Sequence, residues 1–278
     1  PTMYPHLQMR DSARPPVSLA TLERMKSSGG KIACLTCYDA SFAVLVDEAD
    51  TDVVLVGDSL GMVIQGHDTT VPVTMDDMVY HCRAVSRGLQ RPLLMADLPF
   101  ASYPTRDVAL ANAVRLMQEG GAEIVKLESG PSQIDIGEFL AGHDLAVCAH
   151  LGLKPQSVHK TGGFRVQGRE TDAAERMIAS AKALESAGAD VVLLECIPAE
   201  LGQRITEALS VPVIGIGAGP HTDGQILVLY DVLDITTGRK PRFVLNCMDG
   251  ASGNLDAMRR YVRAVKDRSY PAPEHCFT

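Results

Sequence analysis

The sequence lacks an excess of positive charge and any long apolar run. Its 278 residues contain 26 Lys and Arg against 34 Asp and Glu, which gives a net charge of −8 at neutral pH. This balance argues against a nucleic-acid surface and against attraction to an anionic membrane. No apolar stretch is long enough to span a membrane, and the opening segment lacks the basic-then-apolar order of a signal peptide. We therefore expect a cytoplasmic protein.

Motifs for nucleotide, zinc and redox chemistry are also missing or misplaced. The sequence has no Walker motif and no His-Glu-x-x-His. Gly215-Ile-Gly-Ala-Gly219 is followed by proline and comes late in the chain, so it does not match a dinucleotide fingerprint, although a phosphate-binding turn stays possible. Cys34 and Cys37 have redox spacing but fall inside an expected strand. Cys148 and Cys196 lie in apolar runs and are typical of reduced, buried thiols.

What the sequence does contain is a repeated alternation of short apolar runs and amphipathic stretches. The length suits one α/β barrel of about 250 residues. The apolar runs are rich in Val, Ile, Leu or Ala and show little polar alternation, as parallel strands do when both faces are covered. The expected strands are residues 31–38, 52–57, 92–96, 123–127, 145–149, 190–194, 211–216 and, least clearly, 226–229.

Helix signals separate these strands. Ser18 is placed to cap a short helix that precedes the first strand, and Thr74 with Asp77 resembles a capping box. Glycines stand where helices should end, and a last helix is expected to close the fold. Seven clear βα steps and a plausible eighth favour a closed (β/α)8 TIM-type barrel over an open doubly wound sheet. We expect a single domain with an N-terminal helical extension.

The domain boundaries follow from the same pattern. Residues 1–17 are expected to form a flexible N-terminal tail because they show no apolar period. Residues 18–266 are expected to form the catalytic barrel, with no linker-like change of composition inside it. Residues 267–278 are expected to form a C-terminal tail.

Four of the expected strands end on an acidic residue: Asp58, Asp97, Glu128 and Glu195. The two that end in glutamate are near-copies of each other along their whole length. In a parallel barrel, side chains at these ends converge on the active site, and carboxylates without nearby His or Cys suit Mg²⁺ better than zinc. Each acid could instead cap the next helix, although Glu is a poor N-cap. Four acids at one barrel mouth would repel one another without a cation.

Two further side chains are expected near these acids. Lys126 lies two residues before Glu128, so strand alternation puts both on one side, and a buried ammonium there needs an anionic partner. That partner could be a substrate carboxylate or one of the acids. His150 ends another strand, where a site role and a plain structural contact are both open. Residues 160–168 are rich in glycine and could form a mobile loop over the site or an ordinary surface loop.

At this point the residues resemble those of the ketopantoate hydroxymethyltransferase family. The matching blocks run in the family's order over residues 18 to 266 and are together highly specific. They are Thr36-Cys-Tyr-Asp39, Val56-Gly-Asp-Ser-Leu-Gly-Met62, His81, Ala96-Asp-Leu-Pro-Phe100, Val125-Lys-Leu-Glu128, His150-Leu-Gly-Leu-Lys-Pro-Gln156, Gly162-Gly-Phe-Arg-Val-Gln-Gly-Arg169, Leu194-Glu-Cys-Ile-Pro198 and Ile214-Gly-Ile-Gly-Ala-Gly219.

The resemblance implies an enzyme that transfers a hydroxymethyl group from 5,10-methylenetetrahydrofolate to 3-methyl-2-oxobutanoate, the first committed step of pantothenate synthesis. It also implies a bound Mg²⁺ and a homodecamer built from two pentameric rings. Carried over by motif, Asp58, Asp97 and Glu128 belong to the metal site. The same motifs imply that the oxo acid is contacted by Asp58, Ser59, Asp97 and Lys126, and that Glu195 is the catalytic base.

Two rival functions stay open on the sequence. One is another Mg²⁺-dependent enolate barrel of the phosphoenolpyruvate mutase or isocitrate lyase kind, which would share the metal and the strand-end acids but would need no folate. The other is a non-catalytic metal-binding or assembly protein on the same scaffold.

Overall fold

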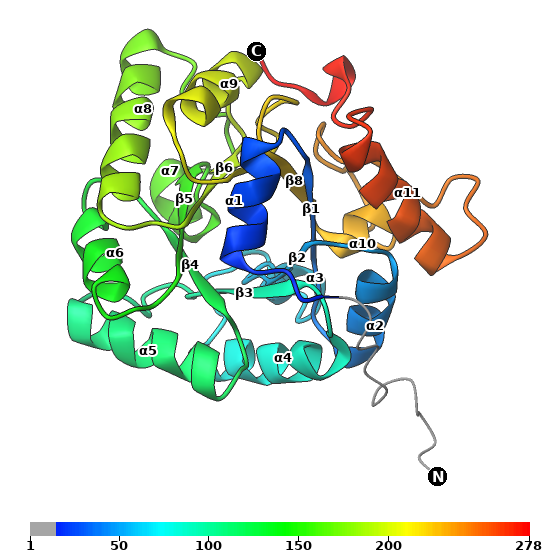
Figure 1. Cartoon of the computed structure of the whole chain (residues 1–278), viewed down its shortest axis with the longest axis horizontal. Coiled ribbons are helices and arrows are strands. Elements are labelled where there is room, and N and C mark those ends of the chain that lie inside the picture. Colours follow the sequence, from blue (N-terminus) through cyan, green and yellow to red (C-terminus); the bar gives the residue numbers. More distant parts are fainter. Residues whose placement is uncertain (1–14) are drawn as a thin grey trace.

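Eight parallel strands close into a barrel in the computed structural model, which describes residues 15–278. Each strand pairs with its neighbours in chain order, and β1 pairs with β8 to close the ring. Figure 1 shows the barrel with helices packed around its outside. The strands are β1 Ile32–Thr36, β2 Val53–Val56, β3 Leu93–Asp97, β4 Ile124–Glu128, β5 Val147–Gly152, β6 Val191–Glu195, β7 Val213–Ile216 and β8 Gly224–Leu227. The expected (β/α)8 barrel is confirmed.

The helices follow the capping signals of the sequence. Ser18 and Thr74 each begin a helix through a capping box, and Gly121 and Gly188 adopt positive φ just after helices end. The helices are α1 Leu19–Ser27, α2 Ala40–Glu48, α3 Leu60–Val63, α4 Met75–Gly88, α5 Arg106–Gln118, α6 Ile134–Ala141, α7 Val158–Thr161, α8 Thr171–Ser186, α9 Ala199–Ala208, α10 Leu229–Val232 and α11 Asn254–Lys266, with short 3₁₀ turns at Pro155–Ser157 and Pro273–His275.

The last βα step differs from the expected pattern. In the described chain no helix joins β7 to β8, and residues 217–223 form a loop instead. The eighth strand begins at Gly224, earlier than the expected 226–229. Its polar residue Gln225 hides the strand in sequence, but the side chain is buried and donates to Gly219 O at 3.0 Å and Thr222 Oγ1 at 2.8 Å. Gly219 of this loop packs closely against the start of α9, since a Cβ on Gly219 would lie 2.5 Å from the Cβ of Ala199.

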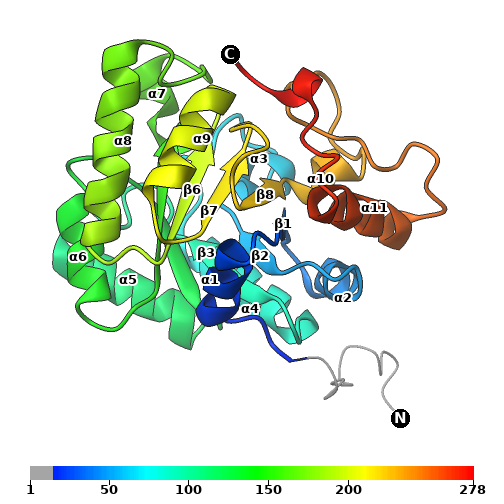
Figure 2. The same cartoon turned by 45° about the horizontal axis from the view of Figure 1, so that its top comes forward.

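One end of the barrel is closed by α1. Val17 and Leu22 join the cluster of inward-facing strand residues, among them the first residues of β1, β2 and β3. Figures 1 and 2 show α1 lying across this end, in front of the strands. We call this the bottom of the barrel, and the opposite end, where the strands finish, the top. Two other clusters fill the space between the strands and the outer helices.

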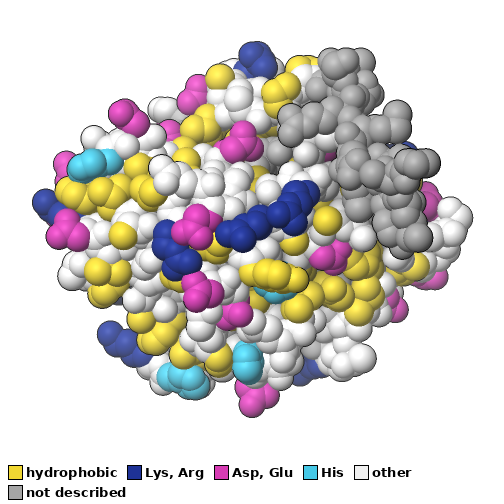
Figure 3. All heavy atoms as spheres, turned by 90° about the horizontal axis from the view of Figure 1, so that it is seen from below, with side chains coloured by type: hydrophobic (Ala, Val, Ile, Leu, Met, Phe, Trp, Pro, Cys, Tyr) yellow, Lys and Arg dark blue, Asp and Glu magenta, His cyan; other side chains and the backbone are white. Residues whose placement is uncertain are grey.

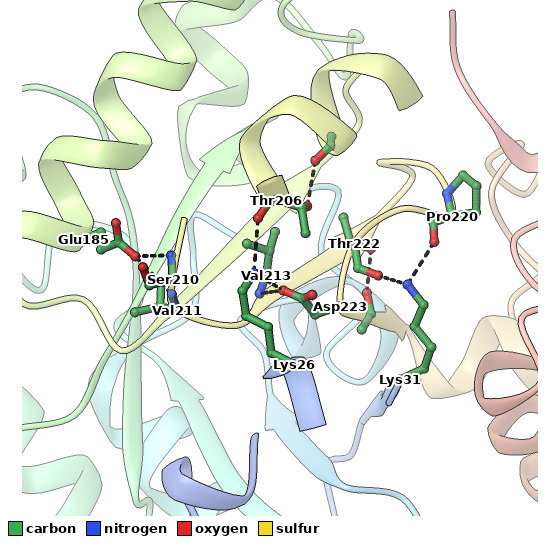
Figure 4. Close-up of polar contacts among 12 residues, drawn as sticks. Lys26, Lys31, Glu185, Thr206, Ser210, Val211, Val213, Pro220, Thr222 and Asp223 are labelled. Atoms are coloured by element: carbon green, nitrogen blue, oxygen red, sulfur yellow. Dashed lines mark hydrogen bonds and ion pairs between the residues drawn. The ribbon is translucent and has the colours of Figure 1, made fainter. Parts of the chain in front are cut away.

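Polar contacts connect α1 with neighbouring elements at the bottom of the barrel (Figure 4). Lys26 of α1 pairs with Asp223 at 2.7 Å and donates to Thr206 O at 3.2 Å. Asp223 in turn accepts from the backbone N–H of Val213 at 2.8 Å. Lys31 donates to Pro220 O at 3.1 Å. These bonds join α1, β1, α9 and the β7–β8 loop.

Most of the expected N-terminal tail, residues 1–17, lies outside the described residues. Within residues 15–17, Val17 is buried and donates its N–H to Arg91 O at 2.8 Å. Residues 267–278 run back over the barrel, with Tyr270 buried and Phe277 in a parallel bridge with Pro198. Among the described helices, none combines the length and the apolar character that crossing a bilayer requires.

Candidate active site

The acidic residues that end the strands line one cavity at the top of the barrel. Asp58 follows β2, Asp97 and Glu128 end β3 and β4, and Glu195 ends β6. The first three therefore come from adjacent strands, while Glu195 comes from further around the ring. All four line a cavity of about 840 Å³ that also contains Lys126 and His150.

None of the four acids caps the helix that follows it. The N-caps of α3, α5, α6 and α9 are Ser59, Thr105, Gln133 and Pro198. The capping alternative is thus wrong for these residues, and their side chains are available to the cavity. Ser59 itself makes no side-chain cap and lies 2.9 Å from the hydroxyl of Tyr38.

Lys126 and Asp97 form a buried ion pair on the cavity floor. Lys126 Nζ lies 2.5 Å from Asp97 Oδ1, and both side chains are less than a tenth exposed. Burial alone would lower the pKa of Lys126, but the charges of Asp97 and Asp58 outweigh it and raise the pKa above its usual value. The lysine is therefore charged at neutral pH. Asp97 Oδ2 also accepts the N–H of Asp58 at 3.0 Å.

Gln156 joins two of the acids and is a residue that sequence reasoning missed. Its backbone N–H donates to Glu128 Oε1 at 2.8 Å, and its side-chain Nε2 donates to Asp58 Oδ2 at 2.8 Å. The side-chain oxygen Oε1 of Gln156 accepts from the Tyr103 hydroxyl at 2.6 Å. The residue lies beyond the end of β5, where it carries no charge and no strand pattern. Its place at the end of a motif shared with the resembling family was the one signal available.

His150 lies between Lys126 and Glu195. Its Nδ1 is 3.5 Å from Lys126 Nζ, and its Nε2 is 3.2 Å from Glu195 Oε2. Burial and the adjacent ammonium lower the pKa of His150 well below its usual value, so the ring is neutral. An ammonium can only donate, which makes Nδ1 the acceptor and puts the ring hydrogen on Nε2, facing Glu195.

Burial raises the pKa of the free carboxyl groups in this cavity. The pKa of Glu128 is raised to about 8, and those of Asp58 and Glu195 are raised to about 7. For Asp58 the charge of Asp97 adds to the effect, while Lys126 opposes it for all three residues. Carboxyl groups whose pKa values lie near neutral pH can accept a proton or bind a cation. Both events remove a buried negative charge that has no compensating partner.

The donor set fits a hard cation bound at least partly through water. Across residues 15–278, no three His, Cys, Asp or Glu side chains lie together at metal-ligand spacing. Gln156 and Lys126 occupy part of the coordination capacity of the acids. Asp97 Oδ1 is nevertheless buried without a hydrogen bond of suitable angle, since its contact with Lys126 is an ion pair only. Carboxylate oxygens with intervening water are typical ligands of Mg²⁺.

The glycine-rich segment 160–168 begins in α7 and continues as a loop beside the cavity. Phe164, Arg165 and Val166 line the cavity, as does Arg169 just after the segment. A second cavity, of about 650 Å³, lies on the other side of Glu128 and Gln156 and is lined by the loops that follow β3, β4 and β5.

Comparison with known sequences identifies close relatives. A family model described as Ketopantoate hydroxymethyltransferase matches residues 16–273. The 3-methyl-2-oxobutanoate hydroxymethyltransferase of Alkalilimnicola ehrlichii is 57% identical over 264 residues, covering 95% of this chain and 95% of that protein. The enzyme of the same name from Nitrosococcus oceani is 55% identical over 258 residues, covering 93% of this chain and 98% of that protein.

Solved structures with a similar fold are much more distant in sequence. Oxaloacetate acetylhydrolase in complex with 3,3-difluorooxalacetate matches with a TM-score of 0.59 and 16% identity, over 93% of this chain and 99% of that one. Phosphonopyruvate hydrolase in complex with oxalate and Mg²⁺ matches with a TM-score of 0.57 and 14% identity, over 76% and 80% of the two chains. At these identities the likeness shows the fold alone.

Proposed function

The chain belongs to the ketopantoate hydroxymethyltransferase family, and from this premise we propose how its top cavity performs that reaction. A hydroxymethyl group passes from 5,10-methylenetetrahydrofolate to 3-methyl-2-oxobutanoate, which gives ketopantoate and tetrahydrofolate in the first step of pantothenate biosynthesis. One observation carries the proposal: a buried ammonium and three carboxylates share a cavity with a fourth carboxylate whose pKa is raised to about 7.

Asp58, Asp97 and Glu128 are the residues that would hold Mg²⁺. When bound, the ion would supply Lewis-acid stabilisation of the negative charge that grows on the oxo oxygen, which is worth several kcal/mol. The raised pKa values of Asp58 and Glu128 support this assignment, since a bound cation would compensate their buried charge. The phosphonopyruvate hydrolase of the same fold was solved with Mg²⁺ and a small dicarboxylate.

Lys126 would bind the carboxylate of the oxo acid. Asp58, Asp97 and Ser59 would also contact the oxo acid. Without substrate, the ammonium is neutralised by Asp97. An incoming carboxylate can share it, because an ammonium has three donors and no acceptor. The sequence left open whether the lysine serves the substrate or the acids, and the arrangement allows both in turn.

Glu195 would be the base that removes the proton from C3 of the oxo acid. Its pKa near 7 means that about half of the free carboxyl is ionised at neutral pH, close to the optimum for general-base catalysis. His150 Nε2 lies 3.2 Å from the carboxylate, on one side of it. The C3–H bond breaks as Glu195 takes the proton, and the C3 electron pair bonds to the methylene carbon of the folate as one C–N bond of that carbon breaks. Water then bonds to the methylene carbon as the second C–N bond breaks. The water oxygen becomes the hydroxyl, and the two nitrogens, now protonated by the C3 proton and one water proton, leave as tetrahydrofolate.

The family match disfavours both rivals raised by the sequence. The phosphoenolpyruvate mutase and isocitrate lyase group supplies neighbours in fold at 14–19% identity, whereas the hydroxymethyltransferase relatives reach 57%. A non-catalytic role is disfavoured because the relatives are named as enzymes over nearly the whole chain.

Assembly and compartment complete the proposal. The family resemblance supports a homodecamer of two pentameric rings, which light scattering in solution would test. All seven cysteines are free thiols, and six of them are buried, which supports a reducing compartment such as the cytoplasm.

The test is a proton-exchange and turnover assay on the whole chain. 3-Methyl-2-oxobutanoate in D₂O should lose its C3 proton signal by NMR when protein and Mg²⁺ are present, and addition of methylenetetrahydrofolate should release tetrahydrofolate. Removal of Mg²⁺ with a chelator is the control and should stop both. Exchange without any folate-dependent turnover would instead favour another enolate enzyme, and no exchange would exclude the proposed chemistry.

A further inference from the structure

The top cavity is larger than the oxo acid requires. Its volume of about 840 Å³ is near the upper end of the ~300–1,000 Å³ usual for pockets that enclose drug-sized ligands. The acids and Lys126 occupy only its floor. Apolar side chains also line the cavity, including Met62 of α3, Ile216 at the end of β7 and Phe243 of the loop after α10, and so does the loop before α8. The space beyond the floor must serve another molecule.

Five cationic side chains from the loop before α8 and the loop after α10 line the cavity. We call this group the cationic rim: Arg165 and Arg169 come from the loop before α8, and Arg239, Lys240 and Arg242 come from the loop after α10. Of these five described side chains, only Lys240 pairs with an Asp or Glu side chain, that of Asp234, and Arg242 donates to Cys276 O at 3.4 Å. Arg169 donates to Thr278 O at 3.2 Å, and Arg242 lies 5.9 Å from the ring centre of Phe277. Like charges gathered in this way favour binding of an anion.

The rim differs from two other parts of the surface. On the face below α4 and α5, basic and acidic side chains lie beside each other (Figure 3), and Arg115 pairs with both Asp76 and Glu119. The second cavity likewise neutralises its arginine, since Arg106 pairs with Asp135. A chain with a net charge of −8 therefore gathers five cations at the mouth of this cavity with a single printed side-chain carboxylate partner among the described residues.

The second substrate has the matching chemistry. In methylenetetrahydrofolate the reactive methylene lies at the junction of the pterin and the aminobenzoyl group, and the glutamyl carboxylates lie at the far end. If the methylene is to reach C3 of the oxo acid on the floor, the pterin enters the apolar middle of the cavity and the glutamyl tail points outward. Phe164, which is 53% exposed at the mouth, offers a flat apolar surface beside that path.

We propose that the cationic rim binds the glutamyl tail of the folate co-substrate, and that it favours folates with several glutamates over those with one. This inference rests on the proposed function, because it assigns a subsite to the co-substrate of that reaction. Each added glutamate brings another carboxylate to a group of cations in which, among the described residues, no arginine pairs with an Asp or Glu side chain. The attraction should weaken with ionic strength, since the rim is largely exposed to solvent.

Binding and turnover should both depend on tail length. Tetrahydrofolate with one, three or five glutamates is titrated by calorimetry, and methylenetetrahydrofolate of the same three lengths is assayed for turnover. In the wild type, Kd and KM should fall as the tail lengthens. Arg239→Gln and Arg165→Gln should each raise Kd and KM for the triglutamate by about 3–10-fold, and the double variant by more, with the KM for the oxo acid unchanged.

Two controls make the test specific. Arg87→Gln removes the same charge from an exposed site in the last turn of α4, away from the cavity, and should change neither constant. A tetrahydropterin without a glutamyl tail should bind the wild type and the rim variants equally. If instead the rim variants bound every tail length as the wild type does, the inference would be wrong even with full turnover. Absence of C3 exchange and of tetrahydrofolate release in the wild type would overturn the proposed function, while tail-dependent binding would still support the rim.

Discussion

The two ends of the barrel use the same residue types in opposite ways. At the bottom, acids that precede β2, β4, β6 and β8 each accept the backbone N–H near the start of the preceding strand. The pairs are Asp52 with Ala33 at 2.9 Å, Glu123 with Leu94 at 3.0 Å, Asp190 with Val147 at 2.8 Å and Asp223 with Val213 at 2.8 Å. Each of these carboxylates fixes the register of two neighbouring strands.

At the top, the acids are buried but are not satisfied by the strands. Asp58 and Glu128 both accept from Gln156, and the Glu195 carboxylate lies 3.2 Å from His150 Nε2. Burial raises the pKa of all three of these carboxyls to near neutrality or above. The bottom therefore uses carboxylates to hold the fold together, whereas the top keeps them reactive. This division agrees with the placement of active sites at the C-terminal face of such barrels.

The strand β6 offers the sharpest comparison, because it begins beside Asp190 and ends at Glu195. Glu195→Gln keeps the size of the side chain but removes the proton acceptor. We expect C3 exchange to fall by about 10²–10⁴-fold, or ~3–5 kcal/mol of transition-state stabilisation. Affinity for Mg²⁺ and the oxo acid should change little. Exchange is measured by NMR in D₂O.

Two matched variants control this prediction. Asp190→Asn, at the other end of the same strand, should leave exchange intact and lower the thermal midpoint. Glu128→Gln should weaken Mg²⁺ binding first. Wild-type exchange in Glu195→Gln would mean that the base lies elsewhere, and His150 would then be the next candidate.

The largest effect on stability is expected at the bottom, from Asp52. Its carboxylate is 2% exposed and pairs with Arg91 at 3.1 Å and with Lys266, in addition to the N–H of Ala33. Asp52→Asn should lower the free energy of unfolding by about 2–3 kcal/mol, less than for a fully buried pair because the cations can reach water. Denaturant titration measures the change. Asp50→Asn, at the exposed partner of the same arginine, should cost less than about 0.5 kcal/mol.

Two lysine–aspartate pairs, one at each end, separate binding from stability. Lys126→Met removes the ammonium at the top and should raise the KM for the oxo acid by about 10–100-fold, since a charge-assisted bond contributes ~1.5–3 kcal/mol. The KM for the folate should stay nearly the same. Lys26→Met removes the ammonium that pairs with Asp223 at the bottom and should lower only the thermal midpoint. An unchanged KM in Lys126→Met would show that this lysine merely balances Asp97.

The comparison also explains what sequence could and could not predict. Strand-end acids such as Glu128 and Glu195 are visible because they interrupt apolar runs, and barrel geometry then places them together. Gln156 was missed because its role comes from reaching residues 28 and 98 positions away. The carboxylate–backbone hydrogen bonds at the bottom were missed for the same reason, since only strand register brings Asp190 next to the N–H of Val147. The β7–β8 loop was missed because a buried Gln225 looks like a surface residue.

The smallest expected effect concerns the cost of keeping Glu195 buried. Its pKa is raised by burial from 4.5 to about 7 in the folded chain. A raised pKa means that the folded state holds the proton more tightly than the unfolded state. The group therefore stabilises the fold fully below the unfolded pKa, and this contribution is lost as the pH rises through 7.

The Glu195→Gln side chain has no proton to lose over this pH range. At pH 5 the variant and the wild type should unfold at similar temperatures, and at pH 8, without Mg²⁺, the variant should be more stable by about 1–3 kcal/mol. Thermal unfolding across this pH range measures the difference. The same carboxylate should give wild-type C3 exchange a rising limb with a midpoint near pH 7, because only the ionised form accepts the proton. A stability gap that did not grow between pH 5 and pH 8 would show that the ionised Glu195 is buried without a cost, and the raised pKa of this carboxyl would be wrong.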